Sequence, residues 1–209
     1  MTGPRPDITD SLVHYARGTN LDEAFNVLRT ILREQRLRCG TGYIRGGHCC
    51  VCFSEAPFRY LGYAITQGYG AQRPYRPFGI MVKKDWLFAH GGRPVVYQLE
   101  DQYTELPESH RWRHVRYDPC ASPPVDFSWE REWRIRVDEL QIDPSVAEVV
   151  LPSEPFLETL LYEHERQQDH YEDMYRQVFD ELTAWQLRSG FPWTVHTLAP
   201  DGSVARAPT

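Results

Sequence analysis

The segment SLVHYARGTNLDEAFNVLRTILREQ, residues 11–35, carries the clearest secondary-structure pattern of the chain. Its first six residues form a short, mostly apolar run, which is typical of a buried strand. The rest repeats apolar side chains at helical spacing and predicts an amphipathic helix. Asn20, with Glu23 three residues later, is the expected N-cap of that helix, and Thr19 is the alternative cap.

Further strands and helices follow along the chain. Helical patterns cover residues 57–67 and 155–187, and the second is one helix or two, because its centre is polar all round. The stretches 68–77, 85–92 and 100–124 contain Gly, Pro and polar residues and predict connections. Apolar or alternating runs predict strands at 48–55, 78–84, 93–100, 126–137, 147–153 and 191–198. This order predicts an α+β fold, with short helices packed on a split or strongly bent mixed sheet.

Length and composition suit one compact domain, since the chain has 209 residues of which 41% are hydrophobic. We expect that domain over residues 11–198, with flexible ends at 1–10 and 199–209. The formal net charge of −6 provides no general attraction to nucleic acid, although arginines cluster locally. No apolar run approaches the ~20 residues that span a bilayer, and no signal core is visible. We therefore expect a cytoplasmic protein without membrane contact.

Five cysteines are present, and three of them crowd into HCCVCF, residues 48–53. An odd number in this arrangement predicts no disulfide framework and suits a reducing compartment. The segment lacks a second Cys/His pair at zinc spacing. We expect these thiols to pack in the core rather than to bind a metal or to act as nucleophiles.

A pair of glutamates stands out in VDFSWEREWRI, residues 125–135. Strand alternation would turn Trp129 and Trp133 inward and place Glu130 and Glu132 together on the polar face. One interpretation is a solvated face whose charges pair with one another. The other is a cleft in which a carboxylate stabilises an oxocarbenium-like sugar carbon, while its neighbour orients or deprotonates a nucleophile.

Two other polar side chains lie at the ends of predicted strands. His14 precedes the capped helix and could donate a hydrogen bond to a ligand hydroxyl, or could be a structural histidine. Ser54 lies at a strand-to-helix turn, where it could meet a ligand or cap the following helix. The loop 68–77 combines aromatic residues with arginines and could stack a ring, or could be a surface loop.

Three segments together resemble a known family: VHYARGTNLDEAFNVLRTIL (13–32), CFSEAP (52–57) and WEREWRI (129–135). In this order they are similar to AbiGi-type abortive-infection domains of bacteria. They resemble more distantly the ADP-ribosyltransferase fold, including DarT-type enzymes that modify DNA. The resemblance covers roughly residues 11–137, and it departs from the family pattern at Ala16, where Thr or Ser is usual.

The resemblance implies an NAD-dependent mono-ADP-ribosyltransferase that modifies a macromolecular acceptor, either nucleic acid or protein, as a phage-defence or toxin effector. Its Glu-x-Glu spacing implies Glu132 as the catalytic residue and Glu130 as the acceptor-side residue. His14 would contact ribose hydroxyls of NAD, Tyr15 would pack on the nicotinamide, and Ser54 is the nearest match to a Ser-Thr-Ser element. The basic residue that holds the NAD phosphates stays open among Arg38, Arg45 and Arg59.

Two alternatives remain beside this enzyme. The aromatic-rich helical segment 155–187 suits a non-catalytic module of the same fold, an interaction or sensor component of a defence system with a partner protein or antitoxin. The arginine clusters suggest a nucleic-acid enzyme of another kind, which the acidic net charge opposes.

Overall fold

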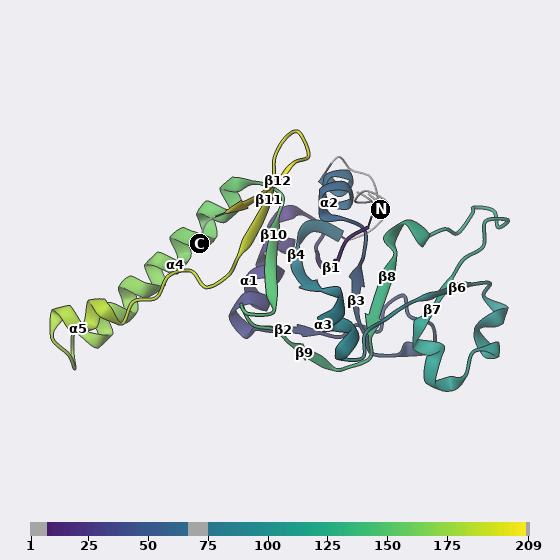
Figure 1. Ribbon diagram of the computed structural model, residues 1–209, viewed down its shortest axis with the longest axis horizontal. Coiled ribbons are helices and arrows are strands. Elements are labelled where there is room, and N and C mark those ends of the chain that lie inside the picture. Colours follow the sequence, from purple (N-terminus) through teal and green to yellow (C-terminus); the bar gives the residue numbers. More distant parts are fainter. Residues whose placement is uncertain (1–7, 67–74, 208–209) are drawn as a thin grey trace, which may run out of the picture.

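The computed structural model describes residues 8–66 and 75–207, and its centre is an eight-stranded mixed sheet (Figure 1). Its strands are β1 (Ser11–Arg17), β3 (Val51–Ser54), β4 (Tyr75–Lys83), β5 (Arg93–Pro94), β8 (Glu132–Ile135), β10 (Ala147–Leu151), β11 (Val195–Leu198) and β12 (Val204–Ala207). Their order is β12-β11-β10-β4-β1-β3-β8-β5. Neighbours are antiparallel except β10 and β11, which are parallel. The fold is mixed α+β, as the sequence predicted.

Two small sheets flank the large one. The strands β2 (Arg36–Arg38) and β9 (Glu139–Gln141) pair antiparallel, whereas β6 (Val96–Gln98) and β7 (His114–Arg116) pair parallel. The chain between β6 and β7 forms two 3-10 helices, η2 (Asp101–Glu105) and η3 (Glu108–Arg113). In Figure 1 this lobe lies beyond β8, at the opposite end of the molecule from the C-terminal helices.

Within residues 8–66 and 75–207, five α-helices accompany the sheets: α1 (Leu21–Glu34), α2 (Phe58–Thr66), α3 (Lys84–Ala89), α4 (Glu154–Tyr175) and α5 (Glu181–Gln186). The predicted cap of α1 is confirmed, because Asn20 Oδ1 accepts a hydrogen bond from the Glu23 amide at 2.9 Å. The Glu23 carboxylate in turn accepts from the Thr19 amide at 2.8 Å. This reciprocal arrangement satisfies two amides at the helix start. None of the helices in the described part of the chain is both long enough and apolar enough to cross a membrane.

The two faces of β1 belong to different parts of the core. Leu12 and Ala16 pack in the main cluster with α1, β4, β10 and the first turns of α4. Val13 and Tyr15 pack on the other face, in a smaller cluster with Phe58 of α2. This alternation decides which side chains of β1 can share a space with residues of β3 and β8.

Several segments differ in detail from the structure that the sequence predicted. Residues 85–92, expected to form a turn, lie mostly in α3, and residues 93–100 divide between β5 and β6, which belong to different sheets. The helical segment 155–187 consists of two helices. Within the tail 199–209, expected to fray, β12 pairs with β11. Of the predicted loop 68–77, residues 68–74 lie outside the described residues, and 75–77 begin β4.

The expectation of no disulfide is wrong. Cys39 and Cys49 are bonded, with their Cα atoms 5.3 Å apart. They flank an isolated antiparallel bridge between Gly40 and Cys50, which brings the end of β2 next to the start of β3. The bonded cysteines are 10 residues apart, and their spacing in the sequence did not reveal the pairing. Burial raises the pKa of the free thiols of Cys50 and Cys52, which suits the expected packing role.

Candidate functional site

A cleft opens where β1 and β3 part. β1 pairs with β4 along most of its length but with β3 at a single residue pair, Val13 opposite Ser54. Beyond that pair, the His14 ring donates from Nδ1 to the backbone oxygen of Cys52 at 2.8 Å. The carbonyl of Cys52, at the point where the two strands separate, thus accepts its hydrogen bond from a side chain. The sheet is therefore held together here by an imidazole instead of by backbone pairing.

The cleft consists of two adjoining hollows of about 40 and 350 Å³. The smaller is lined by His14, Tyr15, Ser54 and Trp129 among others, and the larger by Tyr43, Arg45, Glu100 and Arg116 among others. Five residues line both hollows: Arg17, Cys52, Tyr75, Glu130 and Glu132. The two glutamates and the histidine predicted from the sequence therefore border one continuous space.

The local structure around the glutamates differs from the predicted strand. Residues Ser128–Glu130 form a 3-10 turn, η4, Arg131 has a φ of 46°, and β8 begins only at Glu132. Trp129, expected to face inward, is 45% exposed at the cleft. The period-two argument fails because the chain leaves the extended conformation before the strand starts. Glu130 therefore reaches the cleft from this turn, whereas Glu132 reaches it from the first position of β8.

Two hydroxyl groups hold the turn in place. Ser54 Oγ donates to the Glu130 carbonyl at 2.6 Å and accepts from the Ala56 amide at 3.1 Å. Tyr97 Oη accepts from the Glu132 amide at 3.1 Å and donates to the Phe127 carbonyl at 3.3 Å. The hydroxyl of Ser54 therefore acts on the backbone that carries Glu130, and it does not cap α2, which begins at Phe58.

Glu132 is held by a buried arginine. Its two carboxylate oxygens accept from Arg134 Nε at 2.8 Å and from Nη2 at 3.1 Å. Arg134 Nη1 donates to the carbonyls of Trp112 and His114 at 2.9 and 3.0 Å. The side chains of Glu132 and Arg134 are 14% and 4% exposed, so the predicted pairing of charges exists but is not a solvated one. Each carboxylate oxygen retains lone-pair capacity for a ligand.

His14 lies at the seam of the sheet. Alternation places it on the α1 side of β1, its ring meets Phe53 edge-on at 5.8 Å, and it lines both the cleft and a hollow beside α1. Burial lowers its pKa to about 4, so the ring is neutral at pH 7. Because Nδ1 carries the proton that the Cys52 carbonyl accepts, Nε2 carries a lone pair. The ring can accept a hydrogen bond from a ligand hydroxyl, and its donor is already used by the protein.

Tyr15 and Tyr75 contribute aromatic walls to the cleft. Among the described residues the buried hydroxyl of Tyr15 finds no hydrogen-bond partner, and burial raises its pKa. An unsatisfied buried hydroxyl destabilises the fold by about 1–3 kcal/mol. Burial, reinforced by the nearby Glu130, raises the pKa of Tyr75 to about 12. A ligand with a polar atom near the Tyr15 hydroxyl would relieve this cost.

The arginines divide into two groups. Arg45 lines the larger hollow, pairs with Glu100 at 2.7 Å and lies 4.4 Å from the Tyr103 ring centroid. Arg38 lies away from the cleft, paired with Glu34 at 2.9 Å and with Glu139 at 3.7 Å. Arg59 belongs to α2, where its guanidinium stacks 4.5 Å from the Tyr60 ring centroid. The structure therefore brings Arg45 to the cleft and leaves Arg38 outside it.

Sequence reasoning missed Arg17, although a signal for it existed. Val13, Tyr15 and Arg17 alternate on one face of β1, so a tyrosine at the cleft implies an arginine beside it. Its guanidinium lies 5.6 Å from the Tyr75 ring centroid and 6.0 Å from that of Tyr43. Within the described residues it forms no ion pair. Arg17 is therefore a cation at the junction of the two hollows.

Potential metal ligands gather elsewhere. Cys39, Cys49 and Asp138 place ligand atoms within 4.8 Å of one another, but the two sulfurs are joined in the disulfide.

The chemistry available at the cleft is that of two carboxylates, a neutral imidazole, buried aromatic hydroxyls and flanking guanidiniums. Comparison of the chain with protein-family models, with curated proteins and with solved structures gives no match.

Proposed function

We propose that the protein is an NAD-dependent mono-ADP-ribosyltransferase that modifies a macromolecular acceptor, nucleic acid or protein, with an ADP-ribosyltransferase-like fold. The observation that supports this most directly is the cleft itself. Glu130, Glu132 and His14 border one space, although they come from opposite ends of the described β1–β8 segment. The resemblance of the sequence motifs to ADP-ribosyltransferases assigns roles to the same three residues.

The reaction begins with the glycosidic bond of NAD between nicotinamide and ribose C1′. When this bond breaks, its electron pair leaves with nicotinamide, and positive charge develops on C1′ and the ring oxygen. Glu132 supplies a fixed negative charge, which the Arg134 fork holds in one orientation. An acceptor nucleophile then attacks C1′ and loses its proton to Glu130. Losing one such preorganised charge lowers the rate on the order of 10²–10³-fold.

The remaining residues bind NAD in this proposal. His14 Nε2 accepts a hydrogen bond from a ribose hydroxyl, and Tyr15 packs on the nicotinamide while its hydroxyl gains a polar partner. Arg17 and Arg45 hold the pyrophosphate from the wider hollow. Arg17 needs no rearrangement, whereas Arg45 exchanges Glu100 for phosphate.

The test is release of nicotinamide and transfer of label from NAD labelled in its adenosine part. Purified protein is incubated with labelled NAD and with cell extract, and the extract is treated with nuclease or protease to identify the acceptor. Glu132→Gln should lose at least about 100-fold in both signals, while Glu158→Gln, an exposed position on α4, should match the wild type. Equal activity of the two variants, or no nicotinamide release by the wild type, would contradict the proposal.

The biological setting proposed is defence against phage, or toxicity toward the host cell. Induced expression in a bacterial host should then slow growth, and Glu132→Gln should relieve the effect at equal protein level. If the wild type and Glu132→Gln both arrest growth, the toxicity does not arise from this cleft.

A second candidate is a non-catalytic interaction or sensor module with the same cleft. The observation that favours it is the bidentate ion pair, which engages both oxygens of Glu132. In that case calorimetry would detect NAD binding without release of nicotinamide. Arg17→Ala would weaken this binding. Cells that express Glu132→Gln would grow as cells that express the wild type do.

A further inference from the structure

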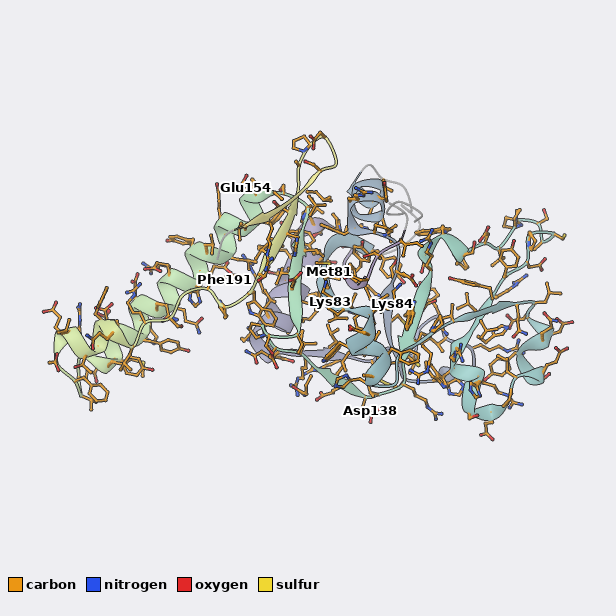
Figure 2. All side chains as sticks on the ribbon, in the orientation of Figure 1. Met81, Lys83, Lys84, Asp138, Glu154 and Phe191 are labelled. Carbon is orange, nitrogen blue, oxygen red and sulfur yellow. A yellow bond between two sulfur atoms is a disulfide. The ribbon has the colours of Figure 1, made fainter. Side chains whose placement is uncertain are left out.

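The C-terminal helices form an arm that extends from the body of the protein (Figures 1 and 2). We define the arm as residues 161–188, which comprise the last four turns of α4, the connecting turn and α5. The first turns of α4 are anchored, because Leu157 and Leu160 are buried in the main core. Beyond them the helix leaves the sheet, although the base of the arm still contacts the body, where Glu163 pairs with Arg29 of α1.

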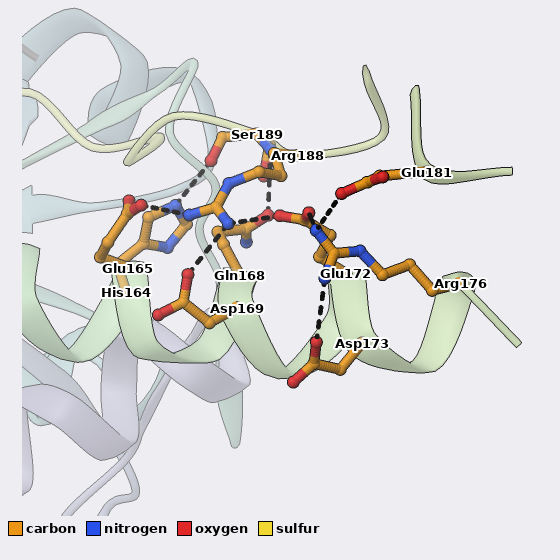
Figure 3. Close-up of polar contacts among 10 residues, drawn as sticks. All are labelled: His164, Glu165, Gln168, Asp169, Glu172, Asp173, Arg176, Glu181, Arg188 and Ser189. Atoms are coloured by element: carbon orange, nitrogen blue, oxygen red, sulfur yellow. Dashed lines mark hydrogen bonds and ion pairs between the residues drawn. The ribbon is translucent and has the colours of Figure 1, made fainter. Parts of the chain in front are cut away.

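The inside of this hairpin is polar (Figure 3). Arg188, on the return segment, donates to Asp169 at 2.9 Å and to Glu172 at 2.7 Å, and also pairs with Glu165. Gln168 accepts from the Ser189 amide at 3.0 Å. Gln168 and Glu172 are 7% and 8% exposed, and they are among the few buried polar residues of the chain.

The outside of the arm is apolar. At the end of α4 the side chains of Tyr171, Met174 and Tyr175 follow the i, i+3, i+4 spacing of one helix face, and Val178 follows in the connecting turn. Rings of Tyr171, Tyr175 and Phe179 follow one another at 6.4 Å centroid spacing. The exposed large side chains of the arm are Leu161 (38%), Tyr162 (66%), Tyr171 (38%), Met174 (50%), Tyr175 (39%), Val178 (79%), Phe179 (47%), Leu182 (63%), Trp185 (60%) and Leu187 (48%).

This is the reverse of the pattern that a hairpin needs when it stands alone in water. Buried polar groups and a cluster of exposed large apolar side chains are the informative departures from ordinary burial, and such clusters mark interaction sites. We propose that the outer apolar face of the arm docks on the same face of a second copy of the chain. The two hairpins would form a two-fold symmetric, four-helix contact.

The area of the face suits this occupant. A stable interface needs about 800 Å² from each partner. Large aromatic and aliphatic side chains carry about 150–250 Å² each, so the eight from Tyr171 to Leu187, exposed to the extents given above, present on the order of 800 Å². The undescribed segments 1–7, 67–74 and 208–209 cannot supply this cover. Their large apolar or aromatic residues are Met1 and Tyr69.

The charges of the arm also favour a second copy over a basic partner. The arm holds seven carboxylates against three arginines, yet each carboxylate already has a partner within the chain. Glu163 pairs with Arg29, and Asp180 caps α5 through Thr183. The other five pair with Arg176 or Arg188. No carboxylate of the arm therefore requires a cation from outside, and what remains unmatched is the apolar face.

The test is the mass of the full-length protein in solution, measured by light scattering after gel filtration and by sedimentation. We expect twice the mass of the chain. Leu182→Glu and Trp185→Glu should each weaken the dimer at least about tenfold, because a carboxylate would have to be desolvated in the contact. The matched control is Leu21→Glu, which places the same change on an exposed leucine in the first turn of α1, and it should leave the mass unchanged.

Salt gives an independent readout. Because each arm has four more acidic than basic residues, sodium chloride should strengthen the dimer by screening their repulsion, whereas a contact held by ion pairs would weaken. A monomer at concentrations up to about 100 µM, far above the Kd of a stable interface of this size, would overturn the proposal. So would a dimer that persists in both arm variants while circular dichroism shows them folded. The outcome does not depend on activity toward NAD.

Discussion

At the scale of the residue, the cleft is organised by side chains whose hydrogen bonds are made to other groups of the protein. Arg134 uses its guanidinium on one carboxylate and two carbonyls, and Ser54 uses its hydroxyl on the turn that carries Glu130. Such groups position the candidate reactive atoms without needing to touch a substrate. Among the residues singled out from sequence, Ser54 therefore acts on backbone, whereas Glu132 and Tyr15 keep capacity for a ligand.

The ion pair between Glu132 and Arg134 gives the first prediction. Arg134→Met should lower the free energy of unfolding by about 3–5 kcal/mol, because it leaves a buried carboxylate without its counterion. Glu132→Leu combined with Arg134→Met should recover much of this loss, since no charge then remains. Urea unfolding at pH 7 measures both. A loss below about 1 kcal/mol for Arg134→Met would mean that the pair behaves like a surface ion pair.

His14 gives a prediction about pH. Its pKa in the folded protein is about 4, below the ordinary value of 6.5, so the unfolded chain binds the proton more tightly. The contribution of the neutral ring is complete above pH 6.5 and is lost as pH falls toward 4, by up to ~1.4 kcal/mol per pH unit. Urea unfolding at pH 7, 6 and 5 should show a shallower slope for His14→Gln than for the wild type. Parallel slopes would show that the ring titrates as it does in water.

At the scale of the element, β1 determines where the cleft lies. It pairs closely with β4 and leaves β3 after one residue pair. Gly79 of β4 lies opposite Tyr15, and a Cβ built there would stand 2.3 Å from the His14 carbonyl oxygen. The close approach of these two backbones therefore depends on the absence of a side chain at residue 79. It also fixes the position of His14 relative to the cleft.

Gly79→Ala should therefore destabilise the protein by about 1–3 kcal/mol, since the clash is with backbone and needs a strand to shift. Thermal unfolding measures this effect, and fluorescence titration with NAD tests whether the cleft is disturbed. Gly40→Ala is the control, because a Cβ at that position meets nothing within 4 Å. We expect the control to stay within about 0.5 kcal/mol of the wild type. Equal effects of the two substitutions would contradict the close-packing argument.

At the scale of the whole molecule, the disulfide connects a remote segment to the cleft. Cys39 and Cys49 close a loop, residues 40–48, whose members Tyr43 and Arg45 line the larger hollow. The wide part of the cleft is thus built by a covalently closed loop on one side and by the lobe of β6 and β7 on the other. Both lie outside the strands that hold His14 and Glu132.

Removing the disulfide between Cys39 and Cys49 should make the loop at residues 40–48, which lines the larger hollow, less rigid. Cys39→Ser with Cys49→Ser should lower the free energy of unfolding by about 2–3 kcal/mol, the loop-closure value for a short loop, and should weaken binding of NAD. Thermal unfolding with and without a dithiol reductant measures the first effect. The wild type should respond to the reductant and the double variant should not. A response of the double variant would point to the free thiols Cys50, Cys52 or Cys120 instead.

The sequence by itself determined the local elements and the class of the fold. The strand at 11–16, the helix that Asn20 caps, most strands of the central sheet but not β12, and the α+β order follow from periodicity and capping, which act between residues a few positions apart. It also pointed to His14, Glu130 and Glu132. Repeating patterns of this kind persist in the tertiary structure, because burial of the same apolar faces stabilises both the individual elements and the folded chain.

Only the tertiary structure decided how those residues meet. The turn at Ser128–Glu130, the parting of β1 from β3 and the distance of Arg38 from the cleft all depend on contacts between segments far apart in the chain. The pairing of Cys39 with Cys49, only 10 residues apart, accompanies a bridge between Gly40 and Cys50. Hydrogen bonds such as that from Ser54 to the Glu130 carbonyl overrode the extended pattern of the local sequence. A local pattern contains no information about which distant carbonyl, thiol or carboxylate will become a neighbour.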